Sequence, residues 1–136
     1  PISFIFIIKL HPHTQVHTEG TNCDIPSEEL LPVADIVITD YSSILFDAMI
    51  YQLPLVLFAP DLEEYLASRG FYLDYRTLPG IHIQKEEQLV KVLSDEARLN
   101  SSVNQKYHDF FQDYMAACDG HATRRIMNYV SKSPNK

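Results

Sequence analysis

The residues best suited to chemistry lie in one short polar stretch, Thr39-Asp40-Tyr41-Ser42-Ser43. This stretch follows the β-branched run Ile36–Ile38 and precedes an apolar pattern that begins at Ile44. The pattern predicts a buried strand, a tight turn and a helix that Asp40 or Ser42 caps. Such a turn presents free backbone N–H groups and hydroxyls at a helix N-terminus, which favours an anion. The alternative is that Asp40 and Ser42 only cap a helix in an ordinary α/β domain.

Histidines follow the first apolar run of the chain. His11 lies beside Pro12, where this run must end, and the carboxyl ends of parallel strands are where α/β proteins bind ligands. An imidazole at that place could act as a general base or donate to a phosphate. In an extended segment His13 points the same way as His11, so that Asp40 or His17 could complete a metal site. The third interpretation is that these are loop histidines without a role.

Two further charged residues are candidates for ligand contacts. Asp47 lies four residues after Ser43 on the predicted helix, where its carboxylate could accept from a ribose diol or simply face solvent. Arg125 begins the last predicted helix, after a break at Asp119-Gly120. The alternative for this break is a C-cap glycine followed by an ordinary helical turn.

The elements that would position these residues alternate between strand and helix. Apolar runs predict strands at residues 3–9, 35–39, 53–58 and 79–83, and helical periodicity predicts helices at 26–31, from 44, at 62–68, 85–93, 103–115 and 126–130. The first strand is expected to be covered on both faces, and Asp61 to cap the helix at 62–68. The aromatic-rich residues 70–75 fit no element. This alternation predicts a Rossmann-like parallel sheet flanked by helices.

Size, charge and missing motifs narrow the function classes. The 136 residues fit one domain, and the formal charge of −7 argues against a nucleic-acid surface. Dinucleotide and P-loop glycine motifs are absent, so a nucleotide would bind by another device. Cys23 and Cys118 are far apart, which is typical of free thiols in a reducing compartment. Because the chain starts inside a predicted strand without Met, we expect a fragment of a longer protein.

Taken together, these segments resemble the C-terminal half of the CDP-glycerol glycerophosphotransferases. The similar segments follow in the family's order: Lys9-Leu10-His11-Pro12, residues 34–47, residues 54–58, residues 61–65, residues 69–75, Leu78-Pro79-Gly80, and Asp119-Gly120 with Arg125. The combination of a strand followed by T-D-Y-S-S-x-x-F-D with the later G-F-Y-x-D-Y is more specific than any single segment. His13 departs from the pattern, since a basic residue such as Arg or Lys is usual there.

The resemblance implies the donor-binding half of a GT-B enzyme, with the active site in the cleft between two Rossmann-like domains. Such enzymes transfer glycerol phosphate from CDP-glycerol to a hydroxyl of a teichoic-acid-like or capsular polymer, or of a lipid-linked acceptor, and release CMP without a cofactor. By carry-over, His11 is catalytic, Thr39, Ser42 and Ser43 hold the diphosphate, and Asp40 shapes the turn. Asp47 and Arg125 are further donor-binding candidates, whose contacts the family pattern does not fix.

The resemblance also implies partners that this chain lacks. The family's N-terminal domain contributes a second histidine and the acceptor and membrane contacts, so the whole enzyme would lie in the cytoplasm at the inner face of the plasma membrane. We expect the isolated half to bind CDP-glycerol with little turnover. Two other functions stay open: a nucleotide-sugar-dependent GT-B glycosyltransferase domain and a non-catalytic nucleotide-binding domain.

Overall fold

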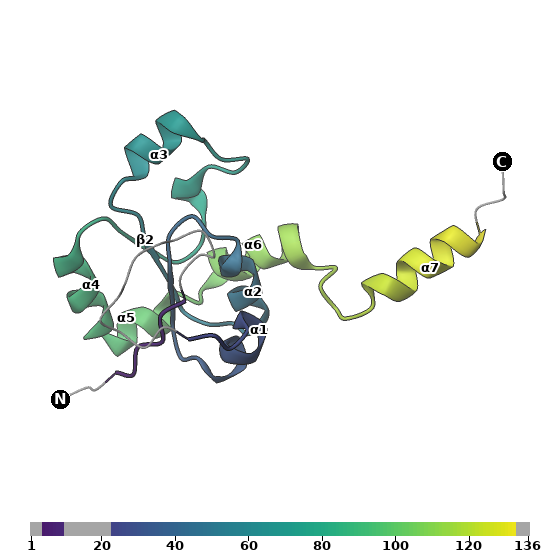
Figure 1. Cartoon of the computed structure of the whole chain (residues 1–136), viewed down its shortest axis with the longest axis horizontal. Helices are drawn as coiled ribbons and strands as arrows, with labels where there is room; N and C mark the ends of the chain where they lie inside the picture. The colour runs from purple at the N-terminus through teal and green to yellow at the C-terminus, as the bar shows by residue number, and fades with distance from the viewer. Residues whose placement is uncertain (1–3, 10–22, 133–136) are drawn as a thin grey trace.

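A computed structural model describes residues 4–9 and 23–132, and its centre is a parallel sheet of three strands (Figure 1). The strands are β1 (Val37–Thr39), β2 (Leu55–Phe58) and β3 (Ile81–Ile83), in that spatial order. Val37 is in register with Leu55, and Val56 with Ile81. The predicted α/β fold with a parallel sheet is therefore confirmed, and β1 and β3 are the outer strands of this three-stranded sheet.

Helices connect and cover these strands. They are α1 (Ser27–Leu30), η1 (Leu31–Val33), α2 (Ile44–Ile50), α3 (Leu62–Ser68), η2 (Tyr75–Thr77), α4 (Glu86–Leu93), α5 (Glu96–Ser101), α6 (Gln105–Met115) and α7 (Ala122–Lys132). The bounds predicted for α3 are confirmed. The short α5 was not predicted, because its single buried apolar side chain, Leu99, gives no helical period.

The two faces of the sheet carry two separate hydrophobic cores. Because side chains alternate along a strand, Leu55 and Leu57 enter one core and Val56 enters the other. The first core includes buried side chains of α2 and α6, and the second includes those of α4 and α5. With helices on both faces, Leu55, Val56 and Leu57 of β2 are fully buried and Phe58 is half-buried, as expected for a continuous apolar run.

A glycine fixes the approach of β3 to β2. Gly80 has a φ of +117°, and a Cβ there would lie 2.9 Å from the carbonyl oxygen and the Cβ of Leu55. No other residue type fits at this place without moving the backbone. The Leu78-Pro79-Gly80 segment therefore serves the packing of the sheet.

The prediction for the first apolar run is wrong over the part that the structure describes. Within residues 4–9 the only strand-like pairing is an isolated bridge at Ile8, and the segment is not a strand of the three-stranded sheet. Phe4, Phe6 and Ile7 are exposed, and Ile5 is 94% exposed. A continuous apolar run shows that a segment can be covered on both faces, but coverage needs elements that pack on it. Over residues 4–7 this coverage is incomplete, since each of these side chains is at least 40% exposed.

Helix α7 stands apart from the other elements (Figure 1). It has no buried residue, and Ala116–His121 connect it to α6. Among the described residues, no helix combines the length and apolar character that crossing a bilayer requires.

Candidate functional site

The polar stretch Thr39–Ser43 forms a solvent-accessible bend at the carboxyl end of β1. Thr39 is half-buried as the last residue of the strand, whereas Asp40, Ser42 and Ser43 are exposed. This bend leads directly into α2. The sheet therefore places the predicted phosphate-binding residues together at one edge, open to a ligand, as the pattern of strand, turn and helix indicates.

Local hydrogen bonds hold the bend and leave donors free. The Ser42 Oγ accepts from the backbone N–H of Ile44 at 3.3 Å, so Ser42 rather than Asp40 provides the predicted helix-start contact. Ser43 occupies the N-cap position, but its hydroxyl makes no capping bond. Within the described chain, the N–H groups of Tyr41, Ser42 and Ser43 donate no hydrogen bond. Because α2 has only seven residues, we assign anion attraction mainly to these amides and hydroxyls.

A carboxylate from the neighbouring strand contacts the bend. Asp61 follows β2, and its Oδ1 accepts from the Tyr41 hydroxyl at 2.6 Å. The prediction that Asp61 caps α3 is correct for its position and wrong for its side chain, which bonds no helix amide. Burial, and then the hydrogen bond to Asp61, raise the pKa of Tyr41 above its ordinary value. Tyr41 is therefore a hydrogen-bond donor that ties the end of β1 to the end of β2.

An aromatic cluster, which we define as Tyr41, Tyr65, Phe71 and Tyr75, supports the bend from one side. The Tyr41 ring stacks on Tyr65 with centroids 3.8 Å apart, and Tyr65 stacks on Phe71 at 5.0 Å. The Tyr75 hydroxyl donates to the carbonyl oxygen of Asp40 at 3.1 Å. These rings pack on one another, whereas the neighbouring Tyr72 is fully exposed.

The structure does not bring every predicted site residue to the bend. Asp47 is exposed on α2, one turn after Ser43 and on the same side of the helix. Arg125 lies on α7, far from α2 (Figure 1), where its Nη1 pairs with Asp119 at 2.7 Å and its Nη2 donates to the Ala117 carbonyl at 2.6 Å. The hydrogen bond from Arg125 lowers the pKa of Asp119. Asp47 and Arg125 stay predictions as donor contacts.

The predicted histidines lie outside the described residues. These are His11, His13 and His17, so neither the general-base role nor the metal site is placed. Across residues 4–9 and 23–132, no group of three or more His, Cys, Asp or Glu side chains is arranged to hold a metal ion. Cys23 and Cys118 are both free.

The chain matches one protein family over almost its whole length. Residues 3–132 match the family described as CDP-glycerol:poly(glycerophosphate) glycerophosphotransferase. The chain belongs to this family. The resemblance read from the motifs is thereby confirmed.

Several relatives of this chain carry names from teichoic acid synthesis. The teichoic acid poly(ribitol-phosphate) polymerase of Bacillus spizizenii is 28% identical over 93% of this chain and 22% of its own length. The teichoic acid glycerol-phosphate primase of the same organism is 26% identical over 97% of this chain and 36% of its own length. The teichoic acid glycerol-phosphate transferase of Staphylococcus aureus is 31% identical over 76% and 27%, respectively. The chain thus spans at most about a third of these relatives.

Solved structures of the wall teichoic acid polymerase TagF share the fold of this chain. One superimposes with a TM-score of 0.64 at 32% identity and covers 76% of this chain and 26% of the TagF chain. Another, of a variant with a replaced histidine, was soaked with CDPG. The prediction of a Rossmann-like sheet of the GT-B type is confirmed by this likeness.

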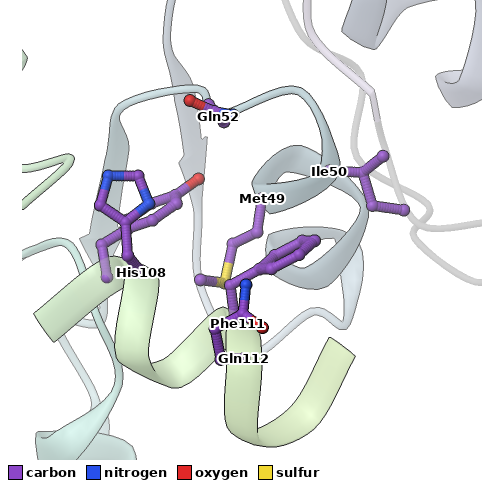
Figure 2. Close-up of a pocket in the computed structure, with 7 residues that line it drawn as sticks. Met49, Ile50, Gln52, His108, Phe111 and Gln112 are labelled. Carbon is purple, nitrogen blue, oxygen red and sulfur yellow. The ribbon is translucent and has the colours of Figure 1, made fainter. Parts of the chain in front are cut away.

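A pocket of about 130 Å³, drawn in Figure 2, is placed by its lining residues at the opposite end of the sheet from the bend. Its lining comes from the end of α2 and from α6: Met49, Ile50, Gln52, Tyr107, His108, Phe111 and Gln112. Because α2 starts at the carboxyl edge and ends just before β2, this pocket lies at the amino edge. None of the predicted site residues that the structure describes lines it.

Sequence reasoning missed the two tyrosine contacts that hold the bend. A signal for the first exists, because Asp61 follows β2 as Asp40 follows β1, and adjacent parallel strands end at the same edge. The contact of Tyr75 with Asp40 spans 35 positions and crosses a segment that fits no regular element. Neither composition nor periodicity indicates it.

Proposed function

We propose that this chain is the donor-binding part of an enzyme that transfers glycerol phosphate from CDP-glycerol to a teichoic-acid-like or capsular polymer. The observation that carries this proposal is the exposed Thr39–Ser43 bend at the carboxyl edge of a parallel sheet, in a chain of this family. In α/β sheets that edge is where phosphate-containing ligands bind.

The bend suits a diphosphate because it supplies donors without a fixed opposite charge. The free N–H groups of Tyr41, Ser42 and Ser43 can each donate to a phosphate oxygen, and exposed hydroxyls add further donors. Phosphoryl transfer asks a protein mainly for positioning and for stabilisation of charge on the phosphates. Local donors matter more here because the whole chain is acidic, with a formal charge of −7.

The transfer would run as a displacement at phosphorus. An acceptor hydroxyl oxygen bonds to the phosphorus that carries glycerol, the bond from that phosphorus to the bridging oxygen breaks, and CMP leaves. The proton of the hydroxyl passes to a general base, for which His11 is the candidate from the sequence. Thr39, Ser42 and Ser43 would hold the diphosphate, with Asp40 shaping the turn.

The remaining assignments follow from the same proposal. Asp47, one turn after Ser43, could accept from the ribose or glycerol hydroxyls of the donor. Arg125 would reach the donor only if α7 packs differently in the whole enzyme, since it pairs with Asp119 here. We further propose that residues 1–136 are one domain of a longer two-domain enzyme that works in the cytoplasm against the inner face of the plasma membrane.

A donor of ribitol phosphate is the second candidate, favoured by a specific observation. One relative that aligns with 93% of this chain is named as a poly(ribitol-phosphate) polymerase. Glycerol and ribitol are both polyols on the same diphosphate, so the bend alone does not select between CDP-glycerol and CDP-ribitol.

Calorimetric titration of the chain with CDP-glycerol tests the proposal. We expect saturable binding at up to millimolar donor, and weaker binding of UDP- and GDP-sugars. Ser43→Ala removes an exposed hydroxyl that bonds nothing in the described chain, so it should weaken donor binding about 10-fold without lowering Tm. Its matched control is Ser101→Ala on α5, which removes another exposed serine hydroxyl, on the opposite face of the sheet. No heat with CDP, CMP, CDP-glycerol or CDP-ribitol would contradict the proposal.

A further inference from the structure

Tyr75 links the aromatic segment after α3 to the backbone of the bend. Its side chain is only 1% exposed, and its hydroxyl donates to the carbonyl oxygen of Asp40 at 3.1 Å. Tyr75 is the first residue of η2, whereas Asp40 directly follows β1. The hydrogen bond therefore holds the end of β1 from a part of the chain that itself supplies no predicted site residue.

The peptide geometry gives this hydrogen bond a consequence for the ligand side of the bend. The Asp40 carbonyl and the Tyr41 N–H belong to one peptide unit, which is planar and trans, so the two groups point in opposite directions. Because Tyr75 holds the carbonyl on the side of the aromatic cluster, the Tyr41 N–H points away from that cluster. This N–H donates to no described residue.

We propose that Tyr75 is a positioning residue for the binding of CDP-glycerol, an inference that rests on the proposed function. Tyr75 sets the orientation of the Asp40–Tyr41 peptide and so directs the Tyr41 N–H at the phosphates. Tyr75 acts through the backbone and does not itself touch the donor. Without this bond the peptide unit can rotate, because turns of different type differ mainly in the orientation of such a peptide.

The Tyr75 hydroxyl has a fixed position because the ring is held on several sides. Phe71 stacks on it with centroids 5.2 Å apart, Tyr41 is tilted against it at 5.5 Å, and His82 meets it edge-on at 5.5 Å. The Nε2 of His82 is in turn 2.9 Å from the carbonyl oxygen of Leu78.

The hydroxyl also remains a donor over the whole physiological pH range. Burial, and then the nearby Asp40 carboxylate, raise the pKa of Tyr75 to about 12. A protonated phenol can donate to a carbonyl, whereas a phenolate cannot.

The chain contains its own matched control for this contact. Tyr107 is also 1% exposed, and its hydroxyl donates to a backbone carbonyl oxygen, that of Leu53, at 3.0 Å. Leu53 lies at the amino edge, before β2, and Tyr107 itself lines the pocket of Figure 2. Tyr75 and Tyr107 therefore make the same kind of hydrogen bond at opposite ends of the sheet.

Tyr75→Phe is the decisive variant, because it keeps the ring and removes only the donor. We expect the dissociation constant for CDP-glycerol to rise about 3- to 10-fold, the range expected for the loss of one neutral hydrogen bond. Tyr107→Phe should leave that constant unchanged. Both variants should lower Tm by a similar amount, because each loses one hydrogen bond of the same kind. Equal weakening by both variants, or wild-type affinity in folded Tyr75→Phe, would overturn the inference.

A measurement without donor separates this inference from the proposed function. In ¹⁵N-¹H spectra of the free chain, Tyr75→Phe should shift the amide resonances of Tyr41 and Ser42, whereas Tyr107→Phe should leave them in place. Unchanged amide resonances in Tyr75→Phe would refute the positioning role whatever the chain binds. If they shift as expected but the wild-type chain binds no CDP-glycerol, the positioning of the peptide stands and the proposed function fails.

Discussion

The two ends of the sheet use the same chemistry for different purposes. At the carboxyl edge, the Tyr75 hydroxyl donates to the carbonyl of Asp40, beside N–H groups of Tyr41, Ser42 and Ser43 that have no partner in the described chain. At the amino edge, Tyr107 bonds the carbonyl of Leu53 in the core between α6 and β2, where the surrounding backbone groups are paired. We infer from this contrast that a buried tyrosine hydroxyl can serve packing, as at Leu53, or orient a peptide for ligand binding, as at Asp40.

The helix that joins the two ends shows the same contrast. At its start, the hydroxyl of Ser43 makes no capping bond. At its end, the N–H of Gln52 bonds the Met49 carbonyl and the N–H of Leu53 bonds the Ala48 carbonyl, which is a Schellman motif. Helix α2 is therefore closed at the amino edge and left open at the edge where we propose that the donor binds.

The largest expected effect comes from the amino edge. Gly80→Ala should lower the free energy of unfolding by about 3 kcal/mol, because it combines an unfavourable φ of +117° with a Cβ placed 2.9 Å from Leu55. Urea unfolding measures this loss, and the folded variant should bind CDP-glycerol with unchanged affinity. Gly120→Ala is the control, since its φ is +74° but no atom lies within 4 Å of the added Cβ. A smaller loss in Gly80→Ala than in Gly120→Ala would contradict the packing argument.

An effect of intermediate size is expected at alkaline pH, where the contributions of Tyr75 and Tyr107 to the free energy of unfolding should fall together. Burial raises the pKa of Tyr107 as well as that of Tyr75, which reaches about 12. The unfolded chain loses these protons near pH 10, so between about pH 10 and pH 12 the native state binds more protons and stability falls as pH rises. Unfolding in urea at several pH values measures the slope. Tyr75→Phe and Tyr107→Phe should each make the slope of stability against pH shallower. An unchanged slope in both variants would contradict the raised pKa of these two tyrosines.

The smallest expected effect is a gain in stability at the amino edge. Gln52 has a φ of +56°, a left-handed conformation that glycine adopts at less cost. Gln52→Gly should therefore raise the free energy of unfolding by about 0.5 kcal/mol, measurable as a higher urea midpoint. Donor affinity should not change, because Gln52 lies at the other end of the sheet from the bend. A change in donor affinity would show that the two ends are coupled.

The sequence by itself determined which segments carry the site and which family the chain belongs to. Strand β2 and helix α3 could be predicted because apolar runs and helical periodicity reflect local preferences and burial. The stretch from Thr39 to Ser43 stood out because a strand that breaks into a polar turn before a helix is a local pattern.

Only the tertiary structure decided which side chains hold that bend. The sequence predicts that Asp61 caps a helix, but its carboxylate accepts from the Tyr41 hydroxyl instead, because folding brings that donor within reach. The exposure of Phe4 to Ile7 likewise depends on which elements pack on the segment. Such contacts join positions that are distant in the chain. The sequence does not predict them because burial and hydrogen bonding depend on the neighbours that folding assembles, whereas propensity depends on the local sequence alone.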